Sequence, residues 1–379
     1  MPHRTRRAAL GAVAVPFVAS RAAVLAVGAI VAVLMRDSPP ANESAVWKLS
    51  AHPLANLLAR WDTFWYLDIA QHGYRWNGHP LEQQNVVFFP LYPLLLRAGG
   101  SIAAGATIWI GLVISLAAFL GALVYVWRWA VDVLHDESAA TFAVAALCAF
   151  PFAVFFSAVY TESLFLLTAV ATFFHLYRHE PRRAAAWALA AGFVRPNGCL
   201  LAIPAAWFVL AESRRRELAS ILAVLAPLVG PLAFSWYLGV TVGDPWAWVA
   251  DQAAWQTVAP WGMRAVPPPG PAIGTTPIAD IVVHTANAAA IVFALSGLVP
   301  VARVAGASAA LFVAVNIAPP IARHGLLSMG RFTSVLFPLF LWLAWRLRGR
   351  RRAQTATLVA FGVGQAVAAA LFFAWRPLV

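Results

Sequence analysis

Long apolar segments recur along the whole chain and are separated by short polar or arginine-rich connections. About 20 helical residues cross a hydrocarbon core that is about 30 Å thick. Nine segments approach or exceed that length, at roughly 12–35, 104–131, 139–158, 161–178, 218–240, 279–301, 304–321, 331–347 and 354–374. The pattern predicts an all-α polytopic membrane protein with about nine full spans, in which residues 1–379 form a single domain.

Composition excludes the soluble classes of protein. Of the 379 residues, 61% are hydrophobic and 11% are charged, and the mean hydropathy is +0.74. A soluble domain is about a quarter charged, because water must wet its surface. Most of the surface of this chain must therefore face lipid.

The net charge of +12 first suggests a nucleic-acid partner. The basic residues are almost all arginines, however, and they cluster within 4–7, 178–183, 214–216 and 346–352, each next to an apolar segment. Cytoplasmic loops of membrane proteins carry this excess of positive charge. We therefore expect no nucleic-acid partner, a multi-pass protein of the cell membrane, and a cytoplasmic N-terminus with an uncleaved first helix.

Residues 184–212 lie between two arginine clusters that should both be cytoplasmic, and they are too few for two comfortable spans. Pro196 and Gly198 would end and reverse a helix, so we expect a hairpin of two short helices with Arg195 and Asn197 at its tip. Irregular backbone at membrane depth requires burial in protein or a wet cavity. Two strongly tilted complete spans are the alternative.

The same topology places two long loops, 36–103 and 241–278, on the external face. Loops of this length are usually functional. In the first loop, residues 60–71 predict a short helix at the membrane interface, where tryptophan and tyrosine are common. Asp62 and Asp68 are six residues apart, about 240° of helical rotation, so the two carboxylates should point in different directions and must be judged separately.

Several polar residues are candidates for chemistry at this face, each with a structural alternative. Asp62 is either a catalytic carboxylate or a helix cap or ion pair with Arg60. Glu162 opens a span that Thr161 could cap, so it is a site residue or a favourable charge in the first turn. Arg195 and Arg331 near membrane depth need an anionic partner, and a phosphate matches the guanidinium fork. The remaining candidates are Trp65, His72, Tyr74, Tyr160, Asp244, Gln252, Trp255 and His324.

Common nucleotide and metal motifs are absent from the sequence. The chain has no GxxxxGK[ST] loop, no HExxH pair, no Asp-x-Asp clamp and no GxSxG turn, and such motifs would mark an ATPase, a metal site or a serine hydrolase. We expect no cofactor and no metal. These absences favour a substrate that carries its own activated group.

The polar and aromatic motifs resemble those of the PIG-V family of membrane mannosyltransferases. They occur in the family's order and are Arg60-Trp61-Asp62, Trp65-Tyr66-Leu67, Ile69-Ala70, Gly73-Tyr74, Phe88-Phe89-Pro90-Leu91-Tyr92-Pro93, Tyr160-Thr161-Glu162-Ser163, Arg195-Pro196-Asn197-Gly198, Gly243-Asp244-Pro245, and Gly330-Arg331-Phe332. The resemblance implies a GT-C fold, a polyprenyl-phosphate-mannose donor and an active site at the external face. The arginine- and alanine-rich composition suggests a bacterial member, so the eukaryotic acceptor is not carried over.

The resemblance also implies roles for individual residues. A carboxylate of the first external loop serves as the catalytic base in such enzymes, and here that residue is Asp62. Arg60, Arg195, Arg331 and His324 are then candidates to bind the donor phosphate. Inverting transfer of mannose to a hydroxyl of a glycolipid, glycan or protein is the expected reaction. The list of residues that would line or support the site is Trp65, Asp68, His72, Tyr74, Tyr160, Glu162, Asn197, Asp244, Gln252 and Trp255.

Two other functions fit the membrane pattern. A transporter or flippase of a lipid-linked sugar would also carry charges at membrane depth, but it predicts paired broken helices in two halves of the chain, and the sequence offers one. A non-catalytic subunit of a membrane glycosyltransferase would keep the fold without the chemistry. Asp62 together with Arg195 and Arg331 favours an enzyme.

Overall fold

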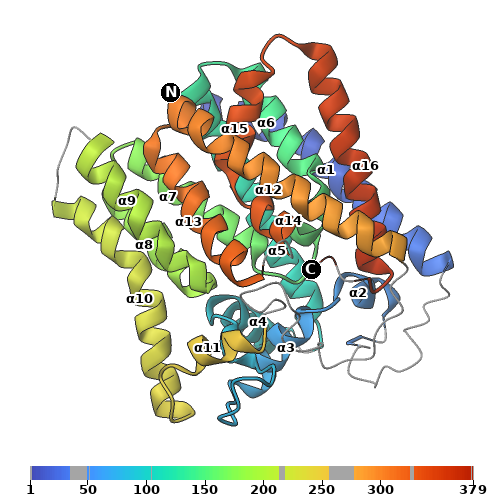
Figure 1. The fold of residues 1–379 in the computed structure, drawn as a ribbon, viewed down its shortest axis with the longest axis vertical. Helices are drawn as coiled ribbons and strands as arrows, with labels where there is room; N and C mark the ends of the chain where they lie inside the picture. Colours follow the sequence, from blue (N-terminus) through green and yellow to red (C-terminus); the bar gives the residue numbers. More distant parts are fainter. Residues whose placement is uncertain are drawn as a thin grey trace.

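The computed structural model describes residues 2–34, 49–50, 52–103, 105–212, 218–255, 277–324, 328–376 and 378. All regular structure in these ranges is helical (Figure 1). The α-helices are α1 (Pro2–Leu34), α2 (Pro53–Leu58), α3 (Thr63–His72), α4 (Leu91–Ile102), α5 (Thr107–Leu134), α6 (Glu137–Ala149), α7 (Glu162–Tyr177), α8 (Pro181–Val194), α9 (Ala202–Trp207), α10 (Leu218–Thr241), α11 (Ala247–Ala250), α12 (Pro277–Ala305), α13 (Ala307–His324), α14 (Met329–Ser334), α15 (Phe337–Arg346) and α16 (Arg351–Phe373). Short irregular helical segments are η2 (Asn85–Val87), η3 (Pro151–Ser157), η4 (Pro196–Leu201), η5 (Phe208–Glu212) and η6 (Asp251–Ala253).

The prediction of an all-α polytopic membrane protein is confirmed. Within the described residues, five helices are long and apolar enough to cross a membrane, namely α1, α5, α10, α12 and α16, and a sixth span arises if α6 and η3 are counted together across their 79° bend. Helix α7 is apolar but has 16 residues. The remaining expected spans in this part of the chain correspond to shorter or divided helices, namely α13 and the pair α14 and α15.

Prolines interrupt the predicted spans that form two helices in the structure. The expected span 331–347 forms two helices, α14 and α15, with Pro338 in the first turn of the second one. Proline disfavours helical backbone at the preceding residue and has no N–H to donate. In the same way, Pro151 opens η3 directly after α6 ends. Most residues of the short segments beside these breaks, η3 and α14, are buried in the protein.

The long helices pack against the broken ones. Helices α1 and α16, from the two ends of the chain, lie side by side, while α5, α7, α8 and α10 pack in succession (Figure 1). The short helices α3, α4 and α11 lie together at one end of the long helices (Figure 1). Parts of both predicted external loops therefore occupy the same end of the molecule.

The predicted helix break at Arg195 is confirmed. Helix α8 ends at Val194, the backbone of Arg195 is extended, and η4 begins at Pro196. Gly198 packs against the carbonyl of Ala191, so close that an added Cβ would overlap it. The chain thus turns back on the end of α8, as the hairpin prediction requires.

Helix α8 packs against α10 through two glycines. A Cβ on Gly192 would overlap the carbonyl of Pro227, and one on Gly230 would overlap the backbone of Gly192. Small residues allow helix backbones in membranes to approach closely. This contact sets the position of α8, and so of Arg195 at its end.

Replacing Gly192 with alanine should separate these helices and lower the stability of the protein. Overpacking of this kind costs about 1–3 kcal/mol, so we expect the apparent Tm in detergent to fall by several degrees. Gly362→Ala in α16 is the matched control, because nothing lies within 4 Å of its added Cβ. Equal Tm values for both variants would contradict the close approach of α8 and α10.

Candidate active site

A tyrosine holds the segment that carries Asp62. Trp61 adopts the left-handed conformation, with φ of 51°, and Asp62 follows at the N-cap position of α3. The amide N–H of Asp62 donates to the hydroxyl of Tyr160 at 3.1 Å, and this hydroxyl donates to the carbonyl of Arg60 at 3.2 Å. Tyr160 therefore fixes the backbone on both sides of the turn.

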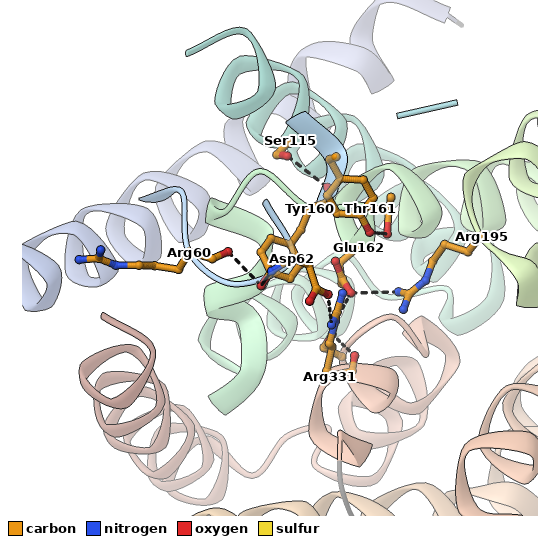
Figure 2. Close-up of polar contacts among 10 residues, drawn as sticks. Arg60, Asp62, Ser115, Tyr160, Thr161, Glu162, Arg195 and Arg331 are labelled. Carbon is orange, nitrogen blue, oxygen red and sulfur yellow. Dashed lines mark hydrogen bonds and ion pairs between the residues drawn. The ribbon is translucent and has the colours of Figure 1, made fainter. Parts of the chain in front are cut away.

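Arg331 joins two carboxylates from distant parts of the chain. Its Nη1 lies 2.7 Å from Oδ2 of Asp62, and its Nε donates to Oε1 of Glu162. Arg195 reaches the same Oε1 of Glu162 through Nη1 at 3.1 Å. Figure 2 shows the two arginines approaching Glu162 from different sides, with Asp62 beside Arg331. Two carboxylates and two guanidinium groups thus form one network with balanced formal charge.

The two carboxylates differ in accessibility. The side chain of Glu162 is 0% exposed, whereas that of Asp62 is 21% exposed. Arg195 and Arg331 are 11% and 13% exposed. A molecule that approaches the network can therefore reach Asp62 and the edges of both guanidinium groups, while Glu162 stays behind them.

Hydrogen bonds and aromatic rings support the network from behind. The guanidinium of Arg331 lies over the ring of Tyr160, 4.8 Å from its centroid. The hydroxyl of Tyr66 on α3 is 3.2 Å from Oγ1 of Thr161, and Ser115 on α5 donates to the carbonyl of Tyr160 (Figure 2). Three helices thus hold the segment that leads into Glu162.

The contacts of Asp62, Arg60 and Thr161 differ from the helix caps and the local ion pair that were their structural alternatives. Asp62 makes no side-chain cap bond to α3 and pairs with Arg331 rather than with Arg60. The side chain of Arg60 extends away from the network (Figure 2) and lies over Trp375, 4.3 Å from its centroid. Thr161 occupies the N-cap position of α7 without a side-chain cap bond.

Asp68 belongs to a separate set of contacts, as the helical spacing predicts. Its carboxylate accepts two bonds from Nη2 of Arg75, at 2.6 and 2.7 Å, and one from Nδ2 of Asn85 at 3.0 Å. His72 lies 3.0 Å away through Nδ1. These bonds fold residues 73–85 back onto α3, which is a structural role.

The aromatic candidates pack together over α3. Trp65 stacks on Phe88 at 5.9 Å and meets Trp255 edge-on at 5.6 Å. Tyr74 donates to the carbonyl of Phe88 at 2.8 Å. Trp255 follows Gln252 in the second predicted loop, so the aromatic residues of both loops are in contact.

The remaining candidates have other surroundings. Asp244 accepts the amide of Trp246 at 2.8 Å and closes a local turn. Asn197 donates to Asn316 on α13 at 2.8 Å, which fastens η4 to that helix. His324 ends α13, but its side chain lies outside the described residues, as do those of the arginines at 4–7 and 214–216. The expectation of no metal or cofactor stays a prediction.

Asp251 is a residue of the second loop that the sequence did not single out. It is 0% exposed, its Oδ2 accepts the amide of Gln84 at 3.2 Å, and Nε1 of Trp255 lies 3.5 Å from the same oxygen. Its Oδ1 has no hydrogen-bond partner in the described part of the chain. Burial raises the pKa of Asp251 to about 7. Only its position next to Gln252 could have drawn attention to it.

The fold and the site define a polytopic membrane protein with an ionic network that joins four separate parts of the chain. The family model for mannosyltransferases of the PIG-V type matches residues 24–224, which include Asp62, Glu162 and Arg195. The chain belongs to the PIG-V mannosyltransferase family.

Curated relatives agree with this assignment. The chain is 34% identical over 229 residues to the rat protein named GPI alpha-1,6-mannosyltransferase 2 (Rattus norvegicus), 32% over 228 residues to the mouse protein of that name (Mus musculus), and 30% over 224 residues to the human one (Homo sapiens). Each alignment covers 56% of this chain and 43% of the relative. The chain is thus similar to less than half of each relative's length.

The raised pKa of Asp251 predicts a pH-dependent stability. The unfolded chain releases this proton near pH 3.9, whereas the folded protein holds it to about pH 7. Between these values the folded state binds more protons than the unfolded state, so its stability falls as pH rises. We expect the apparent Tm to fall from about pH 5 to about pH 8, and Asp251→Asn to reduce this slope. An unchanged slope in that variant would show that Asp251 does not keep its proton.

Proposed function

We propose that this protein transfers mannose from a polyprenyl-phosphate-mannose donor to a hydroxyl of a glycolipid, glycan or protein acceptor at the external membrane face. Membership of the PIG-V family supports the type of reaction. One observation carries the proposal for the site: Arg331 joins an accessible carboxylate, Asp62, to a fully buried one, Glu162.

The difference in exposure assigns different roles to the two carboxylates. Asp62 uses Oδ2 to bind Arg331, and among the described residues no hydrogen bond occupies its Oδ1, which is not sealed from solvent. That oxygen is available to accept a proton from an acceptor hydroxyl. Glu162 is sealed behind two arginines and serves to hold them in place.

Both arginines keep donors for an anion. Among the described residues, Nη2 of Arg331 and both Nε and Nη2 of Arg195 make no hydrogen bond, and none of these atoms is sealed from solvent. Guanidinium groups bind phosphate oxygens in a fork. A lipid phosphate bound here would accept hydrogen bonds from these free donors, which stabilise its negative charge as it grows during bond cleavage.

The proposed reaction is a single displacement at C1 of mannose. The acceptor oxygen forms a bond to C1 while its proton passes to Oδ1 of Asp62. The bond between C1 and the phosphate oxygen breaks, and the phosphate leaves with the electron pair beside Arg195 and Arg331. The configuration at C1 is therefore inverted. A carboxylate is a weak base, so it accepts the proton late, as the attacking hydroxyl becomes more acidic.

Purified protein tests the proposal directly when it is incubated with radiolabelled polyprenyl-phosphate-mannose and a membrane lipid extract. We expect a new labelled product and free polyprenyl phosphate. A flippase would instead move the intact donor across a vesicle membrane and form no product. A non-catalytic subunit would do neither, and either result would overturn the proposal.

Replacing Asp62 with asparagine should abolish transfer without unfolding the protein. Asparagine keeps the shape of the side chain but cannot take the proton, and loss of a general base costs about 10²–10⁴-fold in rate. The measurement is the initial rate of transfer, with the elution profile and Tm in detergent as checks of folding. Asp68→Asn is the control from the same helix. It should lower Tm but have little effect on the initial rate of transfer. Full transfer by Asp62→Asn would remove Asp62 from the role of base.

A further inference from the structure

Arg21 is a buried charge that lies outside the ionic network. Arg21 is in α1, within the apolar window of a candidate membrane span, and is 5% exposed. In the described part of the chain, no carboxylate forms an ion pair with it. An unpaired guanidinium within a membrane span is costly and usually marks function, so its contacts need an explanation.

Arg21 binds both sides of the sharp bend between α6 and η3. Its Nη2 donates to the carbonyl of Cys148 at 3.2 Å, near the end of α6. Its Nη1 donates at 2.7 Å to the carbonyl of Ala153 and at 2.7 Å to Oγ of Ser157, both in η3. The last carbonyls of a helix have no partner within the helix, and a cation is favourable there.

A second buried side chain binds the same bend from the opposite end of the chain. Nε2 of Gln365 on α16 donates to the carbonyls of Cys148 at 2.8 Å and Phe150 at 3.3 Å. Gln365 therefore satisfies the end of α6, as Arg21 does. Of these two side chains, only Arg21 also binds η3. Replacing each side chain in turn therefore distinguishes the effect of releasing the end of α6 from the effect of releasing η3.

The segment that Arg21 holds leads directly into the ionic network. Ser157 ends η3, and within the next five residues the chain places Tyr160 under the Asp62 turn and Glu162 between the two arginines. Phe119, which lies under the Arg21 guanidinium at 5.0 Å, stacks on Phe156 of η3 at 4.3 Å. A displacement of η3 would therefore move both Tyr160 and Glu162.

We propose that Arg21 is a positioning residue for sugar transfer, which fixes η3 so that Tyr160 and Glu162 hold Asp62 and Arg331 in reactive geometry. This inference rests on the proposed function of the site. Arg21 does not contact the network itself. It acts through Ala153 and Ser157, and it ties the first membrane helix of the chain to the site.

The test compares Arg21→Met with Gln365→Leu in the transfer assay. Both substitutions remove bonds to the end of α6 and introduce an apolar side chain, but only the first releases η3. A shift of about 1 Å at a reacting group costs about 10²-fold in rate, so we expect Arg21→Met to lower kcat by about 10–100-fold with the donor KM unchanged within about twofold. Gln365→Leu should keep kcat within about threefold.

A double variant tests the route through η3. If Arg21 acts on Ser157, then Ser157→Ala should lower kcat modestly by itself and add little to Arg21→Met, because residues that act together are not additive. Equal kcat values for Arg21→Met and Gln365→Leu would overturn the inference, and so would a loss confined to KM. If the Arg21→Met protein does not fold, Ser157→Ala carries the test, and unchanged kcat in that variant would overturn the inference.

Hydrogen exchange separates this inference from the proposed function. Residues 151–162 should exchange faster in Arg21→Met than in Gln365→Leu, whether or not sugar is transferred. If the wild-type protein transfers sugar but residues 151–162 exchange equally fast in both variants, Arg21 does not have the positioning role. An inactive wild-type protein with the expected exchange would instead contradict the proposed reaction.

Discussion

The guanidinium of Arg331 is the interaction on which the site depends. It meets Asp62 from the segment before α3 and Glu162 from the start of α7, and Arg195 completes the charge balance. Coulomb interactions between such groups are much stronger away from water than at a wet surface. Removing one charge from a buried group of this kind is costly, because the partner is left uncompensated. The four side chains therefore form one unit rather than separate ion pairs.

The broken helices bring these charges together. Arg331 is on α14, Arg195 lies between α8 and η4, and Glu162 opens α7 a few residues after η3, so three of the four charges lie in or beside short helical segments. Each break exposes backbone carbonyls that must be satisfied inside the protein. Buried polar side chains meet that need at the η3 bend, where Arg21 and Gln365 donate to the carbonyls. The long apolar helices form the frame of the protein, and residues beside the broken helices form the site.

Local sequence patterns predicted much of this arrangement, but they could not predict which distant residues form pairs. Hydropathy gave the membrane class, the motif Arg195-Pro196 gave the hairpin, and helical spacing separated Asp62 from Asp68. The sequence could not pair Asp62 with Arg331, because the two residues are 269 positions apart and no local signal indicates their contact. It offered Thr161 as a helix cap, but the hydroxyl meets Tyr66 instead. Asp251 could not be singled out from the sequence, because its raised pKa results from burial against the other loop.

A double-mutant cycle between Arg331 and Glu162 tests the central claim most directly. The quantity to measure is the free energy of unfolding in detergent for Arg331→Met, Glu162→Gln and the double variant. If the two residues form one charged unit, each single variant leaves a buried charge uncompensated, so the double variant should lose less than the sum, with a coupling of about 1–3 kcal/mol. Additive losses would contradict the account, because Arg331 and Glu162 would then contribute independently.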